Sequence, residues 1–205
     1  MGDKIISPVE FLNVAKLTGM TNKITKIMID KSFKFFSTKS EKEFSINITE
    51  DDLRDGYLSD FLHQKLKQDN ISPNRVVIEV LEGISANYKS GNIEQLIELK
   101  RNGLKIAIDD FGAQNSNFER VHKLDIDFIK IDGSFIKNIA TDPISYKVTK
   151  TITDFSKSIG AKIIAEHVHN LETLNIIKKL GIDYSQGFYL SEPLPCITEG
   201  YYGEK

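Results

Sequence analysis

Short apolar segments alternate with helix-like stretches along nearly the whole chain, and this alternation restricts the fold more than any other feature. Six segments are predicted strands, at 43–48, 75–80, 104–109, 126–131, 161–165 and 182–186. Helices are predicted from Pro8, with Ser7 as the cap, and at 21–37, 51–68, 92–102, 115–123, 143–159 and 170–180. Strands that alternate with helices form βαβ units and a parallel sheet. We therefore predict an α/β fold, and one domain over 1–205 because no linker-like stretch interrupts the pattern.

Two architectures satisfy this alternation, an open doubly wound sheet and a closed (β/α) barrel. A dinucleotide-binding sheet would carry a G-x-G-x-x-G turn after an early strand, and the stretch "DDFGAQN" does not match it. Polar residues instead follow the apolar part of each predicted strand, and barrel enzymes build their sites at this rim. The barrel is therefore the favoured architecture.

The polar residues at the strand ends form a set that one rim would bring together. Side chains alternate between the two faces of a strand, so each predicted strand directs one or two polar groups to its carboxyl end. The set is Asn47, Glu79, Asp109, Asp110, Lys130, Asp132, Glu166 and Gln186. Buried carboxylates must be balanced, and one lysine cannot neutralise them all. An oxygen-rich set with one amide suits Mg²⁺ or Mn²⁺ rather than zinc.

Each of these residues also has a purely structural explanation. Glu79 and Lys130 can form an ion pair, Asn47 can satisfy a backbone group, and Asp110 can cap a turn. For the whole set at successive strand ends, a functional site is the better interpretation.

Composition limits the partners and the compartment. The net charge is −2, with basic and acidic residues mixed throughout, which argues against a nucleic-acid polymer or a membrane surface as partner. Cys196 is the single cysteine, and it is interpreted as an incidental thiol in a reducing cytoplasm.

His167 and His169 form an H-x-H pair that could bind a transition metal. Because no other histidine or cysteine lies near them in the sequence, we interpret them as surface loop residues.

Five motifs in order resemble those of the EAL-domain cyclic di-GMP phosphodiesterases. They are "IEVLE" (78–82), "IDDFG" (108–112), "DFIKID" (127–132), "IIAEHV" (163–168) and "YSQGFYLSEPLP" (184–195), and "ISPVEFLNVAKLTGM" and "FSINIT" also match. The resemblance covers about Ile6 to Pro195. It implies a TIM-like barrel that hydrolyses cyclic di-GMP to the linear dinucleotide with a two-metal Mg²⁺ or Mn²⁺ site.

The resemblance also implies a role for individual residues. Asn47, Glu79 and Asp109 resemble ligands of a first metal, and Asp110 a ligand that helps to place a second. Lys130 resembles the lysine that orients the attacking water, and Glu166 the carboxylate that acts as its general base. Supporting positions are Gln186, Asp132 and Glu82.

Three departures from the family pattern set further expectations. The two first strands, with the Glu-Ala-Leu signature and a substrate-binding arginine, have no counterpart, so we expect a barrel that lacks them and low activity of this chain alone. The loop 113–115 reads Ala-Gln-Asn where Thr-Gly-Tyr is common. His167 and His169 replace the usual glycine and second glutamate.

The alternative function is an inactive EAL-like module that binds cyclic di-GMP or a protein partner. Retention of the metal-ligand set favours the enzyme.

The strands at 43–48 and 182–186 would leave sheet edges unpaired, so a homodimer is expected. A regulatory domain outside these residues is also expected by resemblance.

Overall fold

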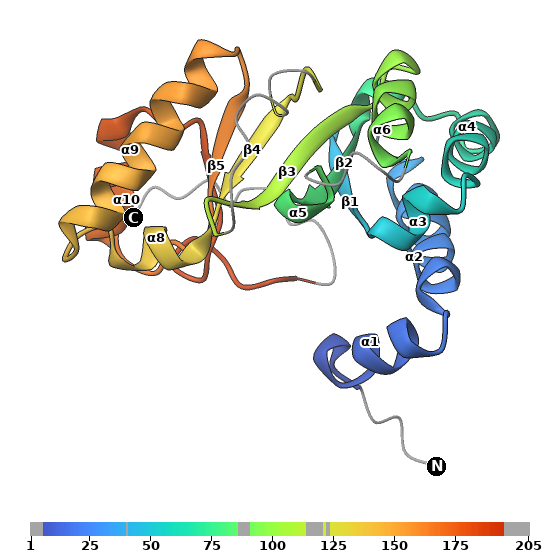
Figure 1. The fold of residues 1–205 in the computed structure, drawn as a ribbon, viewed down its shortest axis with the longest axis horizontal. Coiled ribbons are helices and arrows are strands. Elements are labelled where there is room, and N and C mark those ends of the chain that lie inside the picture. Colours follow the sequence, from blue (N-terminus) through green and yellow to red (C-terminus); the bar gives the residue numbers. More distant parts are fainter. Residues whose placement is uncertain (1–5, 40, 86–90, 114–120, 122–123, 195–205) are drawn as a thin grey trace. The chain divides into compact units, whose positions relative to one another are not determined.

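A computed structural model describes residues 6–39, 41–85, 91–113, 121 and 124–194. Helices and parallel strands alternate along these residues as predicted (Figure 1). They group into two compact units, one of Met1–Val80 with Asn87–Lys105 and one of Leu81–Ala86 with Ile106–Lys205. The extent of a single domain stays a prediction.

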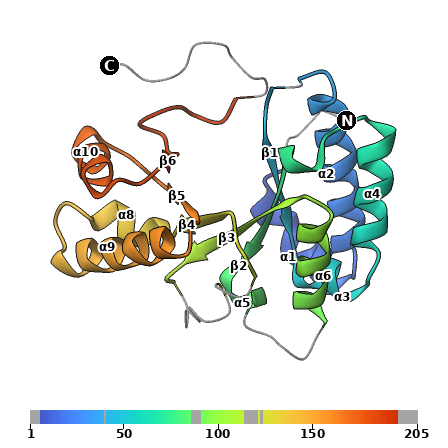
Figure 2. The same ribbon diagram turned by 90° about the horizontal axis from the view of Figure 1, so that it is seen from above.

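The first unit contains two parallel strands and most of the amino-terminal helices. Strand β1 (Phe44–Ile48) pairs with β2 (Val76–Leu81). The helical elements are α1 (Pro8–Leu17), α2 (Thr21–Phe36), α3 (Glu50–Arg54), α4 (Leu58–Gln68), the 3₁₀ turn η1 (Pro73–Arg75) and α6 (Asn92–Arg101). Helix α2 packs on β1 and on α4, and α4 packs on α6 (Figure 2).

The core of the first unit forms between α2 and β1. Ile29 and Phe33 of α2 are fully buried, and the Phe33 ring meets Phe44 edge-on at a centroid distance of 5.6 Å. Along β1 buried and exposed residues alternate, so Asn47 lies on the exposed face. The alternation of apolar and polar residues in the sequence therefore distinguishes the buried face of this strand from its exposed face.

The helix predicted at 51–68 is wrong as a single helix. The structure has two, α3 and α4, separated by Asp55, Gly56 and Tyr57. Gly56 adopts a left-handed φ of 70°, which glycine reaches without steric cost and which ends a helix. The apolar spacing continues across this turn, which is why periodicity alone joined the two helices.

The second unit contains four parallel strands in the order β3-β4-β5-β6. Their bounds are β3 (Lys105–Phe111), β4 (Phe128–Ile131), β5 (Lys162–Ala165) and β6 (Tyr184–Ser185). The helices are α5 (Glu82–Ser85), α8 (Gly133–Asn138), α9 (Pro143–Ser158) and α10 (Leu171–Leu180). Every residue of β4 is buried, and α9 packs on β4 and β5 (Figure 1).

Strands β4 and β6 begin later than predicted because an aspartate precedes each of them. Asp127 Oδ2 accepts a 2.8 Å hydrogen bond from Ile106 N, and Asp183 Oδ2 accepts a 2.9 Å bond from Ile163 N. These side chains satisfy backbone groups of the neighbouring strands, so the ladders start one residue further on.

The helix predicted at 115–123 lies outside the described residues except for Val121, as do Cys196 and most of the loop 113–115. No helix in the described ranges combines the length and the apolar character needed to cross a bilayer.

Candidate metal and catalytic site

The predicted polar residues of the second unit lie at the carboxyl ends of its strands. Asp109 belongs to β3, Lys130 to β4, and Glu166 follows β5 directly. The parallel register pairs Ile131 with Ala165, which brings the ends of β4 and β5 to the same level. These strands therefore deliver their side chains to one rim.

Lys130 is the buried cation of this rim. Its Nζ lies 2.8 Å from Asp109 Oδ1 and 2.9 Å from Glu166 Oε1, and the residue is 5% exposed. A buried ammonium group must be balanced by carboxylates, because its desolvation costs several kcal/mol. Lys130 therefore holds two carboxylates of different strands in fixed positions.

Glu166 has one oxygen engaged and one available. Gln186 Nε2 donates a 2.6 Å hydrogen bond to Oε1, the oxygen that also meets Lys130. Among the described residues, the polar contacts found for this carboxylate all go to Oε1 and leave Oε2 for another partner. Burial raises the pKa of Glu166, while the hydrogen bond and the charge of Lys130 lower it. Such a group is suited to accept a proton.

Asp110 is held in an unusual backbone conformation. Its φ is 54°, in the left-handed region that residues other than glycine rarely adopt, and the β3–β4 register shifts between Ile108 and Phe111. Residues strained in this way cluster at functional sites. Burial raises the pKa of Asp110, and the charges of Asp109 and Asp132 raise it further. Asp132 also caps α8 by accepting a 2.8 Å hydrogen bond from Ser134 N.

Three carboxylates of this rim are close enough to share a cation. Asp109, Asp110 and Glu166 each offer an oxygen, and these oxygens lie within 4.8 Å of one another. Lys130 contacts two of the three, so the cluster carries more negative charge than this lysine balances. Oxygen donors alone fit a hard divalent cation such as Mg²⁺ or Mn²⁺. The cluster thus fits the class of cofactor predicted from the sequence.

Asn47 and Glu79 lie opposite each other in the first unit. The β1–β2 register pairs them directly, with Asn47 exposed and Glu79 8% exposed. The structure brings these two predicted ligands together within their own unit. Their convergence with the carboxylates of the second unit stays a prediction.

Glu82 supports the segment that follows Asp110. It is 4% exposed, and its Oε2 accepts a 3.2 Å hydrogen bond from Gly112 N. Gly112 has a φ of 98°, and a Cβ atom there would lie 2.9 Å from Ile152 Cδ1. A glycine and an acidic acceptor are therefore both needed for this turn.

The two histidines after Glu166 are exposed. His169 Nε2 lies 3.0 Å from Asn170 Nδ2, and the His167 ring packs against Gly133. Among the described residues, the acidic cluster that could hold a metal includes neither histidine.

Sequence reasoning missed two glycines that the rim requires. A Cβ atom on Gly133 would lie 2.1 Å from His167 Cδ2, and one on Gly187 would lie 2.2 Å from the Val168 carbonyl oxygen. The available signal was their position, because each directly follows a polar rim residue, Asp132 or Gln186.

Comparison with known proteins places the chain in a family. The model of the EAL domain matches residues 1–193, so the chain belongs to the EAL domain family. It is 29% identical over 195 residues to the probable cyclic di-GMP phosphodiesterase PdeA of Escherichia coli K12, covering 93% of this chain and 27% of that protein. It is 34% identical over 191 residues to the cyclic di-GMP phosphodiesterase PdeA of Borreliella burgdorferi, covering 91% and 28%. The chain thus spans about a quarter of the length of these relatives.

A solved structure supports the same assignment. The PaMucR phosphodiesterase in complex with c-di-GMP superposes with a TM-score of 0.89 at 25% identity, covering 94% of this chain and 80% of that one. The FimX EAL domain from Pseudomonas aeruginosa, at 24% identity and a TM-score of 0.89, shares the fold. Family and fold together confirm the predicted TIM-like α/β class.

Proposed function

We propose that the chain is the catalytic domain of a phosphodiesterase that hydrolyses cyclic di-GMP to the linear dinucleotide in the presence of Mg²⁺ or Mn²⁺. The observation that carries the proposal is Lys130, buried between Asp109 and Glu166 beside a third carboxylate. The names of the relatives supply the substrate, since they are described as cyclic di-GMP phosphodiesterases.

In this proposal Asp109 and Asp110 would hold the cation beside Glu166, and Asn47 and Glu79 would complete the ligand set by resemblance. A divalent cation, when bound, supplies Lewis-acid stabilisation of the charge that develops on the phosphate oxygens. Protein donors already orient Asp109 Oδ1 and Glu166 Oε1. The second oxygen of Asp109 would then serve the cation, and that of Glu166 the attacking water.

Lys130 and Glu166 act on the attacking water. By resemblance, the Lys130 ammonium would orient the water, and Glu166 Oε2, which serves the water and not the cation, would accept its proton. Gln186 keeps the Glu166 carboxylate in one rotamer through its bond to Oε1. A base fixed in this way contributes about 10²–10⁴-fold to the rate.

The test is hydrolysis of cyclic di-GMP by the protein with Mn²⁺ or Mg²⁺. Glu166→Gln keeps the size of the side chain and removes the base, so we expect kcat to fall by about 10²-fold or more. Glu172→Gln, at an exposed position of α10, is the matched control and is expected to keep full activity. Full activity of Glu166→Gln would remove the base from the mechanism. Binding of cyclic di-GMP without hydrolysis by the wild type would favour the alternative, an inactive binding module.

The remaining proposals concern location and partners. We propose a cytoplasmic protein, supported by the substrate class and by the single cysteine. A homodimer is proposed from the strand edges, because β1 and β6 each have one strand partner among the described residues. A regulatory domain outside these residues is supported by the greater length of the relatives.

A further inference from the structure

His167 combines a strained backbone with an exposed ring. It follows Glu166 directly, and its φ is 53°, in the left-handed region that favours glycine. Its side chain is exposed, so burial in the core does not explain why a ring occupies this position. Residues held in this conformation persist where the surrounding structure determines them and are frequent at ligand sites.

The ring of His167 packs against the first residue of α8. A Cβ atom on Gly133 would meet Cδ2, Cγ and Nε2 of the His167 ring at 2.1, 2.8 and 3.1 Å, so only glycine at 133 admits the ring there. Gly133 begins α8 just beyond the carboxyl end of β4, the strand that carries Lys130, and His167 itself directly follows Glu166. The backbone of α8 therefore fixes the imidazole at the mouth of the candidate site.

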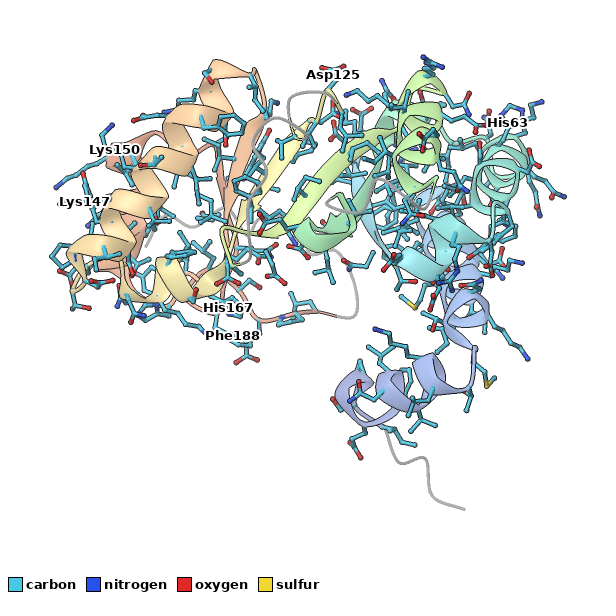
Figure 3. The ribbon with its side chains drawn as sticks, viewed as in Figure 1. His63, Asp125, Lys147, Lys150, His167 and Phe188 are labelled. Carbon is cyan, nitrogen blue, oxygen red and sulfur yellow. The ribbon has the colours of Figure 1, made fainter. Side chains whose placement is uncertain are left out.

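A second exposed ring stands on the adjoining segment. Phe188 is 71% exposed, so most of its ring surface is accessible to a ligand. Its segment is hydrogen-bonded to that of His167, because Val168 N donates to the Gln186 carbonyl oxygen at 3.0 Å and Tyr189 N donates to the Val168 carbonyl oxygen at 3.1 Å. Figure 3 shows the two labelled side chains at the same edge of the second unit.

We propose that His167 contacts the substrate and that, together with Phe188, it holds a guanine base of cyclic di-GMP. The proposal rests on the proposed function. A planar base gains stacking energy on a ring side chain, and the imidazole adds a hydrogen-bonding group at the edge of the base. The base is favoured over the phosphate because Phe188 offers a ring and no charge.

The test separates base binding from phosphodiester chemistry. His167→Gly removes the ring and also the strain of the left-handed backbone conformation. His167→Asn removes the ring and keeps a side chain that tolerates this conformation. The substrates are cyclic di-GMP and bis(p-nitrophenyl) phosphate, a diester that has no base. We expect both variants to raise KM for cyclic di-GMP at least about fivefold, with kcat changed less than about twofold and hydrolysis of the base-free diester unchanged.

Two further variants complete the design. Phe188→Leu keeps an apolar side chain without the ring and is expected to raise KM in the same direction. His63→Asn replaces an exposed histidine of α4, labelled in Figure 3, and is expected to change nothing.

The outcomes distinguish this inference from the proposed function. Unchanged KM in both His167 variants would overturn the contact, and an equal loss on both substrates would assign His167 to the phosphate and overturn the base assignment. If the wild type hydrolyses neither diester, the proposed function fails. The contact is then measured as affinity for cyclic di-GMP with Ca²⁺, where we expect the same fivefold loss, about 1 kcal/mol. No binding by the wild type would overturn both.

Discussion

Lys130 illustrates how one residue determines the state of its neighbours. Its ammonium group stands between Asp109 and Glu166, and all three side chains are mainly shielded from solvent. Replacing it by methionine would leave two carboxylates without their cation. We expect Lys130→Met to lower the free energy of unfolding by about 3–5 kcal/mol in metal-free buffer.

Chemical denaturation in the presence and absence of Mn²⁺ measures this effect. Lys137→Met, at an exposed position of α8, removes the same charge from the surface and should change stability by less than about 0.5 kcal/mol. Added Mn²⁺ should restore part of the loss, since a cation can replace the ammonium charge. A Lys130→Met protein as stable as the wild type would show that the carboxylates do not need this lysine.

Protons and cations compete for the same oxygens at Asp110 and Glu166. Burial raises the pKa of both groups, so their protons bind more tightly than those of ordinary carboxylates. As pH is lowered, Mn²⁺ affinity should therefore begin to fall at a higher pH than it does at a site of exposed carboxylates. The affinity should fall by at most about tenfold per pH unit for each proton that Mn²⁺ displaces. Calorimetric titration of Mn²⁺ at several pH values measures the profile.

The sign of the accompanying stability change follows from the same shifts. The native metal-free protein binds these protons more tightly than the unfolded chain does, so the free energy of unfolding falls as pH rises from the ordinary carboxyl pKa to the raised one. Stability that rises over this window would contradict the raised pKa values.

At the scale of elements, a recurring pattern sets where the strands of the second unit begin. The stretches Ile126-Asp127-Phe128 and Ile182-Asp183-Tyr184 each place an aspartate just before a strand, and each aspartate accepts a hydrogen bond from the backbone of the preceding strand. The side chain acts as the first acceptor of the ladder. Register is thereby determined before regular pairing starts.

Removal of one such acceptor should lower the free energy of unfolding. Asp183→Ala leaves the N–H of fully buried Ile163 without its 2.9 Å partner, and we expect a loss of about 1–3 kcal/mol in the free energy of unfolding. Asp183→Asn keeps an acceptor oxygen and should lose less. Urea denaturation gives the loss, and amide exchange at Ile163 should quicken in the alanine variant alone. Equal stability of the two variants would argue against this role.

Some of these elements can be predicted from the sequence, and others cannot. Alternation of apolar and amphipathic segments predicts the parallel strands, and the polar residue at the end of each strand predicts the rim, because both are local patterns. Helix α8 was not predicted, since six residues are too few for a 3.6-residue period to show. The break at Gly56 and the close approach at Gly133 depend on backbone conformation and on residues distant in sequence. Those contacts exist only in the folded chain.

At the scale of the whole molecule, the proposed ligands divide between two compact units. Asn47 and Glu79 face each other across β1 and β2, and the carboxylates around Lys130 belong to the other unit. By resemblance to the EAL domains, Asn47, Glu79 and Asp109 are proposed ligands of one metal. If so, metal binding links residues that are far apart in sequence and should stabilise both units at once.

A double-mutant cycle tests whether the two groups serve one cation. Glu79→Gln and Asp109→Asn each remove one charged ligand and keep the size of the side chain. If both carboxylates bind the same Mn²⁺, the free-energy losses in Mn²⁺ affinity will deviate from additivity by about 0.5–3 kcal/mol, since the second substitution acts on a site already weakened. Glu43→Gln, at the exposed residue before β1, serves as the control partner for Asp109→Asn and should give additive losses. Additive losses for Glu79 and Asp109 within about 0.5 kcal/mol would mean that the two residues belong to separate sites, because groups without a shared ligand do not couple.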